Sequence, residues 1–225
     1  MLKLAEVFKG FQGEGPTTGS SALFIRMLGC NLSCYLCDSK FSWKQNKLSY
    51  IEISQQDLFE QISNCNRIVI TGGEPLIYSN DQLVKSIVQN FGAIKPIEIE
   101  TNGTIVPSKT ILDLFKKYSI QLNISPKINI QQENDEDTFP HIIKHLKNQN
   151  YIVKFLATNK KDFQLIDQLV DQFHIPCSKV WIQPIGIKSN QVKQTCLNLE
   201  QDILQRNFNL SARLHVLLFE DQRGK

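Results

Sequence analysis

Three cysteines in one short loop constrain this chain more than any other feature of its sequence. Cys30, Cys34 and Cys37 are spaced C-x3-C-x2-C, and the loop holds no fourth Cys or His. Iron–sulfur clusters that only carry electrons usually have four cysteine ligands. Three cysteines therefore indicate a four-iron cluster with one iron open to another ligand. A structural zinc site stays an alternative only if Cys65 or a distant histidine supplies a fourth ligand.

Composition narrows the class of protein. The formal charge of +3, from 25 Lys and Arg against 22 Asp and Glu, is too small to indicate a nucleic-acid partner. Outside the loop, Cys65, Cys177 and Cys196 are scattered, which is unlike a secreted disulfide scaffold and fits a reducing cytoplasm. No stretch resembles a signal peptide or a membrane span. We expect a soluble cytoplasmic protein, with one domain over residues 1–225 because no linker or repeat divides the chain.

Short β-rich runs alternate with amphipathic segments, the pattern of parallel strands joined by crossover helices. Strands are predicted at residues 4–8, 21–27, 67–71, 97–100, 121–124, 151–157 and 179–183, with a final β-like run at 213–219. Helices are predicted to begin at Ser54 and to cover 83–91, 111–115, 141–146, 163–173 and 192–203.

Three further features complete the prediction of structure. The helical period makes Cys196 a core residue rather than a ligand. The acidic stretch 129–137 is predicted to be a solvated, mobile loop to which we attach no function. The charged tail 220–225 is predicted to be frayed unless a ligand holds it.

Polar loops follow five of the predicted strands and are candidates for one site. In an α/β barrel the loops after the strands build the active site, so these loops should face one cavity, which favours an enzyme. They are residues 28–39, 72–75, 101–103, 125–127 and 183–186. Arg26 also stands out in its apolar strand, either as an outward-facing charge or as a guanidinium that binds a carboxylate.

Two motifs together carry a resemblance to a known family. The three cysteines after an apolar strand, with Gly72-Gly-Glu-Pro75 after the next, resemble the radical S-adenosylmethionine superfamily. Further signatures resemble the 7-carboxy-7-deazaguanine synthase family, in order along nearly the whole chain. They are Phe11-Gln-Gly-Glu-Gly15, Phe24-Ile-Arg26, Gly29-Cys-Asn31, Cys37-Asp-Ser39, Glu100-Thr-Asn-Gly103, Ser125-Pro-Lys127, Gln183-Pro184 and His215-Val-Leu-Leu. The resemblance implies an α/β fold, a partial, open TIM-like (β/α)6 barrel.

The resemblance also implies a reaction. In the superfamily, S-adenosylmethionine binds the open iron of a [4Fe–4S] cluster, and its reductive cleavage gives a 5′-deoxyadenosyl radical that takes a hydrogen atom from the substrate. In the family, the substrate 6-carboxy-5,6,7,8-tetrahydropterin contracts to 7-carboxy-7-deazaguanine with loss of ammonia, a carbon–nitrogen lyase step that feeds queuosine biosynthesis. The cofactor performs the radical chemistry while the protein positions the reactants. Mg²⁺, an electron donor such as flavodoxin and a homodimer are further expectations from the resemblance.

Site residues follow from the same resemblance. Cys30, Cys34 and Cys37 would bind the cluster, and the hydroxyl of Ser39 would bind Mg²⁺. S-adenosylmethionine would be held by Leu36, Cys37, Asp38, Gly73, Glu100, Asn102, Ser125, Pro126, Lys127, Gln183, Pro184, Ile185 and Gly186. The pterin site would be lined by Phe11, Gln12, Gly13, Glu14, Arg26 and Thr71. Glu14 and Arg26 are the expected catalytic residues, and Arg26 would pair with the substrate carboxylate.

Other functions stay open at this point. A glycyl-radical activase would share the cysteines and Gly72-Gly-Glu-Pro75 but would not need residues 11–15 or Arg26. A zinc-stabilised, non-catalytic binding protein is the second alternative. An RNA-binding module is the third, although the sequence has no aromatic-basic motif or concentrated basic patch.

Overall fold

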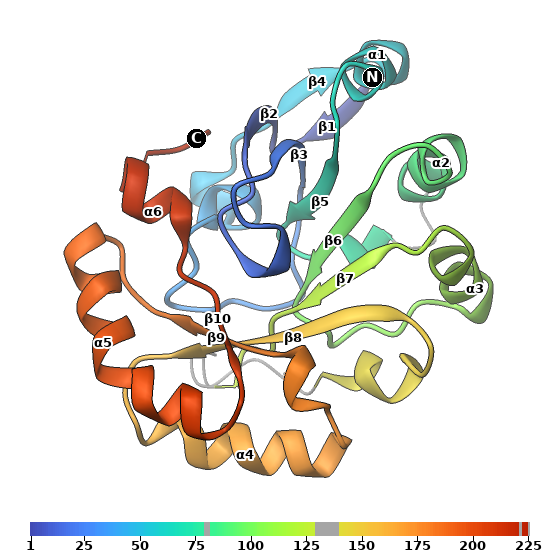
Figure 1. Ribbon diagram of the computed structural model, residues 1–225. Helices are drawn as coiled ribbons and strands as arrows, with labels where there is room; N and C mark the ends of the chain where they lie inside the picture. The colour runs from blue at the N-terminus through green and yellow to red at the C-terminus, as the bar shows by residue number, and fades with distance from the viewer. Residues whose placement is uncertain (79–81, 129–139, 221, 225) are drawn as a thin grey trace.

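The computed structural model is built around one curved sheet (Figure 1). It describes residues 1–78, 82–128, 140–220 and 222–224. Within them, eight strands are ordered β10-β9-β8-β7-β6-β5-β3-β2. The six parallel neighbours at the centre are β3 (Ser21–Met27), β5 (Ile68–Gly72), β6 (Ile97–Thr101), β7 (Gln121–Ile124), β8 (Asn150–Ala157) and β9 (Val180–Pro184). These strands form the partial, open barrel that the resemblance implied.

The two edges of the sheet differ from its centre. At one edge β2 (Glu6–Phe11) runs antiparallel to β3, and at the other the short β10 (Asn209–Leu210) is parallel to β9. Hydrogen bonds between loops connect these edges, from Gly15 N to Ser211 Oγ at 3.0 Å and from Leu214 N to Gly13 O at 2.7 Å. The barrel is therefore open as a sheet, yet its first and last segments are in contact.

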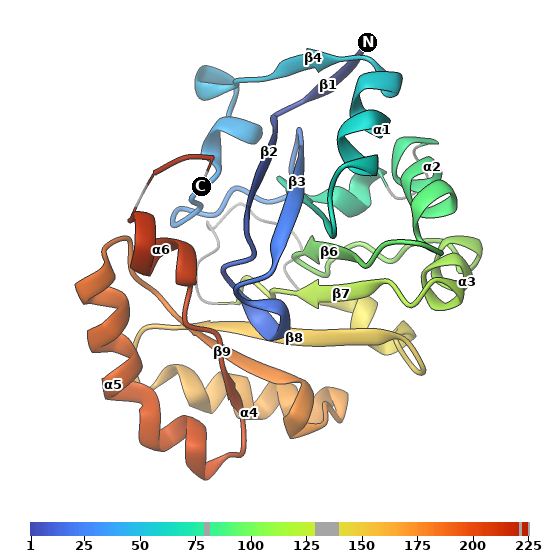
Figure 2. The ribbon, with the colours of Figure 1, turned by 45° about the horizontal axis from the view of Figure 1, so that its top comes forward.

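Helices cover the outer face of the sheet (Figures 1 and 2). They are α1 (Gln55–Ser63), α2 (Gln82–Phe91), α3 (Lys109–Lys117), α4 (Asp162–Phe173) and α5 (Ser189–Gln205), whereas α6 (Leu214–Phe219) contacts α5 and does not cover the sheet. Short 3-10 helices occur at Gly15–Thr17, Lys40–Ser42, Gln45–Lys47, Pro75–Tyr78, His141–His145 and Cys177–Lys179. As predicted, Ser54 begins α1, because its hydroxyl accepts a hydrogen bond from Asp57 N at 3.0 Å and satisfies a backbone donor of the first turn.

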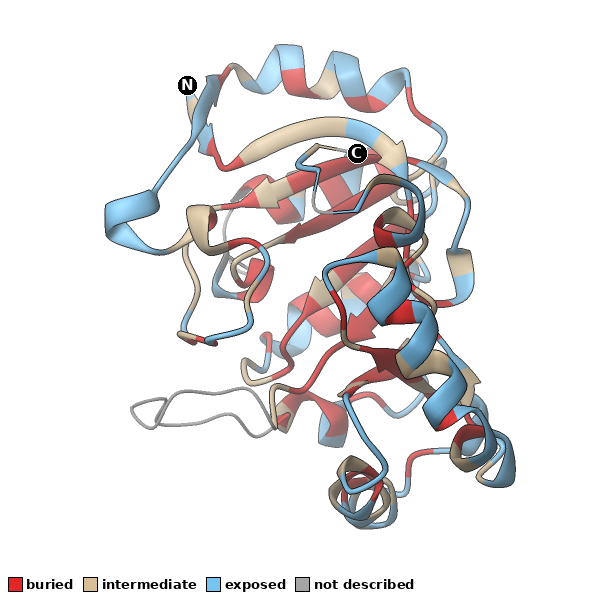
Figure 3. Ribbon diagram, turned by 90° about the vertical axis from the view of Figure 1, so that its left-hand side faces the viewer, coloured by how far each residue is buried: buried red, intermediate tan, exposed pale blue. Residues whose placement is uncertain are grey.

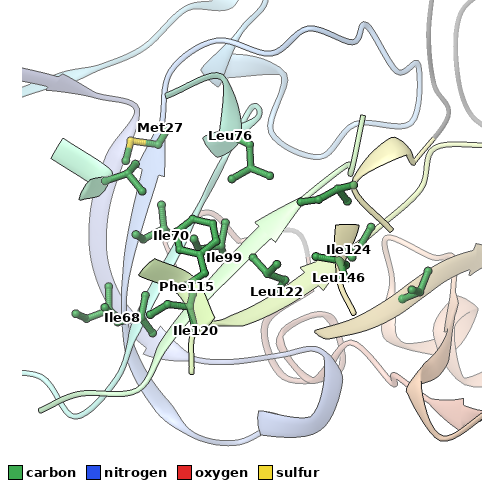
Figure 4. Close-up of a cluster of buried hydrophobic side chains, with 14 of the residues drawn as sticks. Met27, Ile68, Ile70, Leu76, Ile99, Phe115, Ile120, Leu122, Ile124 and Leu146 are labelled. Carbon is green, nitrogen blue, oxygen red and sulfur yellow. The ribbon is translucent and has the colours of Figure 1, made fainter. Parts of the chain in front are cut away.

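Alternation along the strands separates an apolar outer face from a polar interior. Ile68, Ile70 and Leu122 are fully buried on the outer face, where Phe115 of α3 belongs to the same apolar cluster (Figure 4). Each such side chain contributes roughly 1.5–3 kcal/mol by its burial. Figure 3 shows the result, with buried strands beneath helices that are exposed on their outer sides. The alternate, inward positions carry Thr71, Glu98, Glu100, Asn123, Lys154 and Gln183.

A charged cluster fills the inside of the barrel toward the N-terminal ends of the strands. The carboxylate of Glu98 has no exposed surface and accepts hydrogen bonds from Arg67 Nη1 at 2.6 Å and Thr17 Oγ1 at 2.7 Å. Its second oxygen accepts from Gln12 Nε2 and Asn123 Nδ2, both at 3.1 Å. Because both carboxylate oxygens of Glu98 accept hydrogen bonds, its buried charge is tolerated. The cluster occupies only one end of the barrel interior, so the end at the C-termini of the strands is left for a site.

The structure corrects four sequence predictions. The first predicted strand, 4–8, is two strands, because the chain turns at Ala5 and β1 (Leu2–Leu4) pairs with β4 (Ile51–Ile53) in a separate sheet. The run 213–219 is helix α6, not a strand. Cys196 is only partly buried on α5, so it is not a core residue. In the tail, Arg223 forms an ion pair with Glu6, so the prediction of a frayed tail fails at this residue, while residues 221 and 225 lie outside the described residues.

Two other features bear on the remaining predictions. Most of the predicted acidic loop, residues 129–137, lies outside the described residues. Among the described helices, none combines the length and the hydrophobicity that crossing a membrane would require.

Candidate active site

A cavity of about 500 Å³ lies at the C-terminal ends of the parallel strands. Each of the five predicted loops contributes to its wall. The predicted site residues on it are Phe11, Gln12, Gly13, Glu14, Arg26, Cys30, Cys34, Leu36, Cys37, Asp38, Ser39, Thr71, Gly73, Glu100, Asn102, Ser125, Lys127, Gln183 and Ile185. Pro126, Pro184 and Gly186 do not line it. The topology thus brings most of the predicted site into one space.

The three cysteines of the loop 28–39, here called the cysteine loop, share one side of this cavity. They pack with Leu32, Leu156 and Ile185. Leu32 N donates to Cys30 Sγ at 3.4 Å, and Trp43 Nε1 donates to Cys37 Sγ at 3.3 Å. Hydrogen bonds of this kind to cysteine sulfur tune the reduction potential of iron–sulfur clusters.

The chemistry of these thiols fits an iron–sulfur cluster. Burial raises the pKa of Cys30 to about 12, because a bare thiolate is poorly stabilised in this apolar surrounding. The iron of a bound cluster would supply the missing positive charge and take the place of the proton. Within the described part of the chain, no three Cys, His, Asp or Glu side chains converge on the position of a single ion. A four-iron cluster needs no such convergence, since each cysteine binds a different iron.

The paired glycines Gly72 and Gly73, at the end of β5, allow that strand end to pack against the cysteine loop. A Cβ on Gly73 would lie 1.7 Å from Gly29 O, and Gly72 has a φ of +137°, which favours glycine. Glu74 N then donates to Gly29 O at 2.9 Å. Any larger residue at position 73 would separate the two loops.

The carboxylate of Glu74 joins this turn to the end of β6. It is fully buried and accepts hydrogen bonds from Thr101 Oγ1 and Asn102 N, both at 2.7 Å, and from Leu76 N at 2.9 Å. Burial raises the pKa of Glu74, although these bonds partly oppose the shift. Glu74 therefore holds the loops in register and faces protein groups on each side.

Glu14 is the most highly connected side chain of the opposite wall. It forms an ion pair with Lys154 and accepts hydrogen bonds from Gln183 Nε2 at 2.9 Å and Arg213 Nε at 3.3 Å. His215 Nε2 lies 3.8 Å from the same carboxylate. Burial alone would raise the pKa of Glu14, but Lys154, Arg213 and His215 hold it well below its usual range. Glu14 is therefore an ionised acceptor inside the cavity.

The partners of Glu14 have shifted pKa values of their own. Burial lowers the pKa of Lys154, but Glu14 and Glu100 outweigh this effect, so the net shift is upward and the ammonium is retained. Burial lowers the pKa of His215 and the nearby Arg213 adds to the shift, whereas Glu14 opposes it. The wall therefore combines an ionised carboxylate, an ammonium and an imidazole whose pKa is lowered.

Sequence reasoning missed Lys154 and Arg213. Lys154 had a detectable signal, since a charged residue at an inward position of the apolar strand 151–157 resembles the case of Arg26. Arg213 had none, because its position depends on a left-handed turn, with φ +51°, that precedes α6. His215 appeared only within the resemblance.

The two residues before Glu14, Gln12 and Gly13, explain how the Glu14 side chain is placed. A Cβ on Gly13 would lie 2.0 Å from His215 Nδ1, so only glycine allows this approach. Gln12 Nε2 donates to Glu98 and Glu100, and its Oε1 accepts from Glu14 N at 3.1 Å. The Gln12 side chain thus positions both the Glu14 backbone and the Glu100 carboxylate through hydrogen bonds.

Two polar side chains of the cavity wall differ in whether their oxygens have a hydrogen-bond partner. Gln183 Oε1 is buried and has no hydrogen-bond partner among the described residues, so it can accept a donor from a bound molecule. Asp38 is paired with Arg213 Nη2 at 3.0 Å, and Arg213 Nη1 also donates to Gly186 O at 2.8 Å. Arg213 therefore fastens the cysteine loop to the loop after β9.

Arg26 faces the cavity, as expected of a guanidinium that binds a carboxylate and not of an outward-facing charge. Its Nε donates to Glu6 Oε1 at 2.8 Å, and about a fifth of the side chain is exposed. Glu6 and Arg26 are directly opposed in the antiparallel pairing of β2 and β3. Arg26 is thus an inward guanidinium with a protein carboxylate already bound.

Comparisons with known proteins agree with this geometry. The family model described as the radical SAM superfamily matches residues 24–161. A 7-carboxy-7-deazaguanine synthase from Rhodopirellula baltica is 31% identical over 99% of this chain and 88% of its own length. The chain belongs to the 7-carboxy-7-deazaguanine synthase family. It is therefore a radical S-adenosylmethionine enzyme, and a [4Fe–4S] cluster and S-adenosylmethionine are the cofactors of its superfamily.

More distant members support the same assignment. The 7-carboxy-7-deazaguanine synthase from Pyrobaculum aerophilum is 26% identical, and the match covers 100% of this chain and 97% of the relative. The crystal structure of QueE from Escherichia coli is similar to this fold with a TM-score of 0.66 and 26% identity, covering 93% of this chain and 92% of that one. Similarity to the family thus extends over the whole barrel and is not confined to the cysteine motif.

Proposed function

We propose that the cavity binds S-adenosylmethionine and 6-carboxy-5,6,7,8-tetrahydropterin together and that the chain forms 7-carboxy-7-deazaguanine with loss of ammonia. The bound cluster and S-adenosylmethionine would supply the radical that takes a hydrogen atom from the substrate. The observation that supports the proposal most strongly is that three thiols and the Glu14 and Arg26 side chains line the same cavity. A radical released from S-adenosylmethionine at a cluster held by these thiols would be close to a substrate held by those charges.

The cofactor would lie along the ends of the parallel strands. Cys30, Cys34 and Cys37 would hold the cluster, and the buried hydroxyl of Ser39, beside Cys37, would bind Mg²⁺ as a hard oxygen ligand. The unpartnered Gln183 Oε1 would accept a donor from S-adenosylmethionine. The other proposed contacts are Leu36, Asp38, Gly73, Glu100, Asn102, Ser125, Pro126, Lys127, Pro184, Ile185 and Gly186.

The substrate would lie between β2, β3 and the C-terminal segment. Arg26 would bind the substrate carboxylate, and the ionised Glu14 would accept hydrogen bonds from N–H groups of the pterin ring. Lys154 would keep Glu14 ionised and fixed in place. Phe11, Gln12, Gly13 and Thr71 would complete this wall, with Thr71 Oγ1 and Gln12 Nε2 both bonded to Glu100.

The remaining expectations belong to the same proposal. The chain would act in the cytoplasm as a single domain and as a homodimer, with an electron donor such as flavodoxin. We expect no nucleic-acid partner.

An anaerobic assay tests the proposal. Reconstituted protein, S-adenosylmethionine, Mg²⁺ and a reductant are incubated with the carboxytetrahydropterin, and 7-carboxy-7-deazaguanine is measured by mass spectrometry. The proposal requires product and an equal amount of ammonia. Cluster-loaded protein that cleaves S-adenosylmethionine without forming this product would favour a different radical enzyme, such as a glycyl-radical activase.

A further inference from the structure

A carboxylate of β2 holds two guanidiniums at the rim of the cavity. Arg26 Nε donates to Glu6 Oε1 at 2.8 Å, and Arg223 Nε donates to Glu6 Oε2 at 2.9 Å. Arg26 comes from β3, whereas Arg223 comes from the C-terminal segment after α6. In Figures 1 and 2 this segment lies beside the stretch that follows the cysteine loop. All three residues line the cavity.

The aromatic ring of Phe41 supports both guanidiniums. Arg223 Cζ lies 3.7 Å from the ring centroid and Arg26 Cζ lies 5.8 Å from it. Contacts at these distances orient a guanidinium over the ring and favour its positive charge. Phe41 and Glu6 thus fix Arg223 on the cavity wall, although the residue is only two positions from the end of the sequence.

The cluster of Glu6, Arg26 and Arg223 carries a net positive charge. Arg26 and Glu6 alone form a neutral pair, which has little net attraction for a further carboxylate. With Arg223 the group carries two positive charges and one negative charge, so it has one positive charge in excess. Because Glu6 uses one oxygen for each arginine, the remaining guanidinium N–H groups can donate to a second carboxylate.

We infer that Arg223 is a specificity-determining residue that binds the substrate carboxylate together with Arg26, while Glu6 is the internal counter-ion that limits this affinity. The inference rests on the proposed function, because it concerns the carboxylate of the same substrate. It assigns a role to the C-terminal segment and predicts effects of opposite sign for the two partners of one ion pair. A purely structural contact between Glu6 and Arg223 would give effects of the same sign.

Equilibrium binding to the reconstituted protein tests this inference. The probes are 6-carboxypterin and pterin, which differ by the carboxylate, in anaerobic calorimetry with S-adenosylmethionine present. Arg223→Gln should weaken 6-carboxypterin binding about tenfold or more and leave pterin binding unchanged, because a charged hydrogen bond is lost. Glu6→Gln should tighten 6-carboxypterin binding about threefold, because the competing charge is removed.

The controls separate this inference from the proposed function. Arg206→Gln removes an arginine whose partners are Asp167 and Asp202, away from the cavity, and should leave both affinities unchanged. Unchanged 6-carboxypterin binding in Arg223→Gln, equal losses for both probes, or weaker binding in Glu6→Gln would overturn the inference. Failure of the wild-type protein to bind 6-carboxypterin more tightly than pterin would also overturn the inference, whereas failure to form product would overturn the proposed function. If Arg223→Gln does not fold, the sign of the Glu6→Gln effect decides.

Discussion

Lys154 and Glu14 form a buried ion pair across the cavity, although 140 positions separate them in the sequence. Side-chain exposure is 6% for Lys154 and 13% for Glu14. The pair joins the loop after β2 to the inward face of β8 on the far side of the barrel. It therefore connects the first and the later half of the site.

Removing one member of this pair should destabilise the fold strongly. Glu14→Gln leaves the buried ammonium of Lys154 without its direct ion-pair partner, and we expect a loss of roughly 3–5 kcal/mol in the free energy of unfolding. Urea denaturation measures it. The double variant Glu14→Gln with Lys154→Met should recover part of the loss, because both charges are then absent. Losses that simply add would show that the two residues are not coupled.

The stability should depend on pH through the same carboxylate. The pKa of Glu14 in the folded protein is below its usual value of 4.5, so its ionised form stabilises the fold above pH 4.5. This contribution is lost as the pH falls from about 4.5 toward the lowered pKa. The difference in stability between wild type and Glu14→Gln should therefore be constant near neutral pH and shrink below about pH 4.5. A difference that grows on acidification would contradict the assigned direction.

Gly13 offers a test of the contact with the C-terminal segment. Gly13→Ala would place a Cβ 2.0 Å from His215 Nδ1, so it should displace this segment and weaken substrate binding. Gly19→Ala is the control for a glycine replacement nearby in the chain, because no atom lies within 4 Å of the added Cβ, although Gly19, unlike Gly13, has a positive φ. We expect the control to lose only about 1 kcal/mol of stability, with substrate affinity retained. Equal effects on substrate affinity would refute the close packing.

Glu74 should affect cofactor binding by positioning the loops after β5 and β6 and should take no part in the reaction itself. In Glu74→Gln an amide nitrogen must face one of the donors Thr101 Oγ1, Asn102 N or Leu76 N, which should cost about 1–3 kcal/mol of stability. Because Glu74 holds the loop ends together, binding of S-adenosylmethionine should weaken while the cysteines can still bind iron. Calorimetry and iron analysis separate these outcomes. The exposed Glu60→Gln is the control, and a variant indistinguishable from it would contradict this role.

Local patterns predicted those parts of the fold that local sequence determines. Strand 21–27 was predicted to the residue, because Leu23, Ile25 and Met27 are buried on one face while Arg26 lies on the other. Ser54 began the predicted helix because capping involves neighbours only three positions apart. The two motifs also placed the cysteines and Gly73 at one cavity.

Long-range contacts explain what the sequence could not predict. The run 213–219 has an apolar composition that suits either a strand or a helix, and contacts with α5 accompany the helix that forms. Lys154, Arg213 and Arg223 acquire their roles from partners on distant segments, such as Glu14 and Glu6. Only the assembled barrel shows which charges share a wall.

The assignment of the three cysteines has its own test. Replacing Cys34 with Ala should abolish iron binding and product formation together, whereas Cys196→Ala, on the outer helix α5, should change neither. Iron content and the absorbance of the reconstituted protein give the result independently of activity. A Cys34→Ala protein that retains a full cluster would refute the ligand assignment.

The anaerobic product assay tests the central proposal most directly. Wild-type protein with its cluster, S-adenosylmethionine, Mg²⁺ and a reductant should convert 6-carboxy-5,6,7,8-tetrahydropterin to 7-carboxy-7-deazaguanine, with one ammonia released per product. Cluster-loaded protein that cleaves S-adenosylmethionine but leaves the pterin unchanged would contradict it.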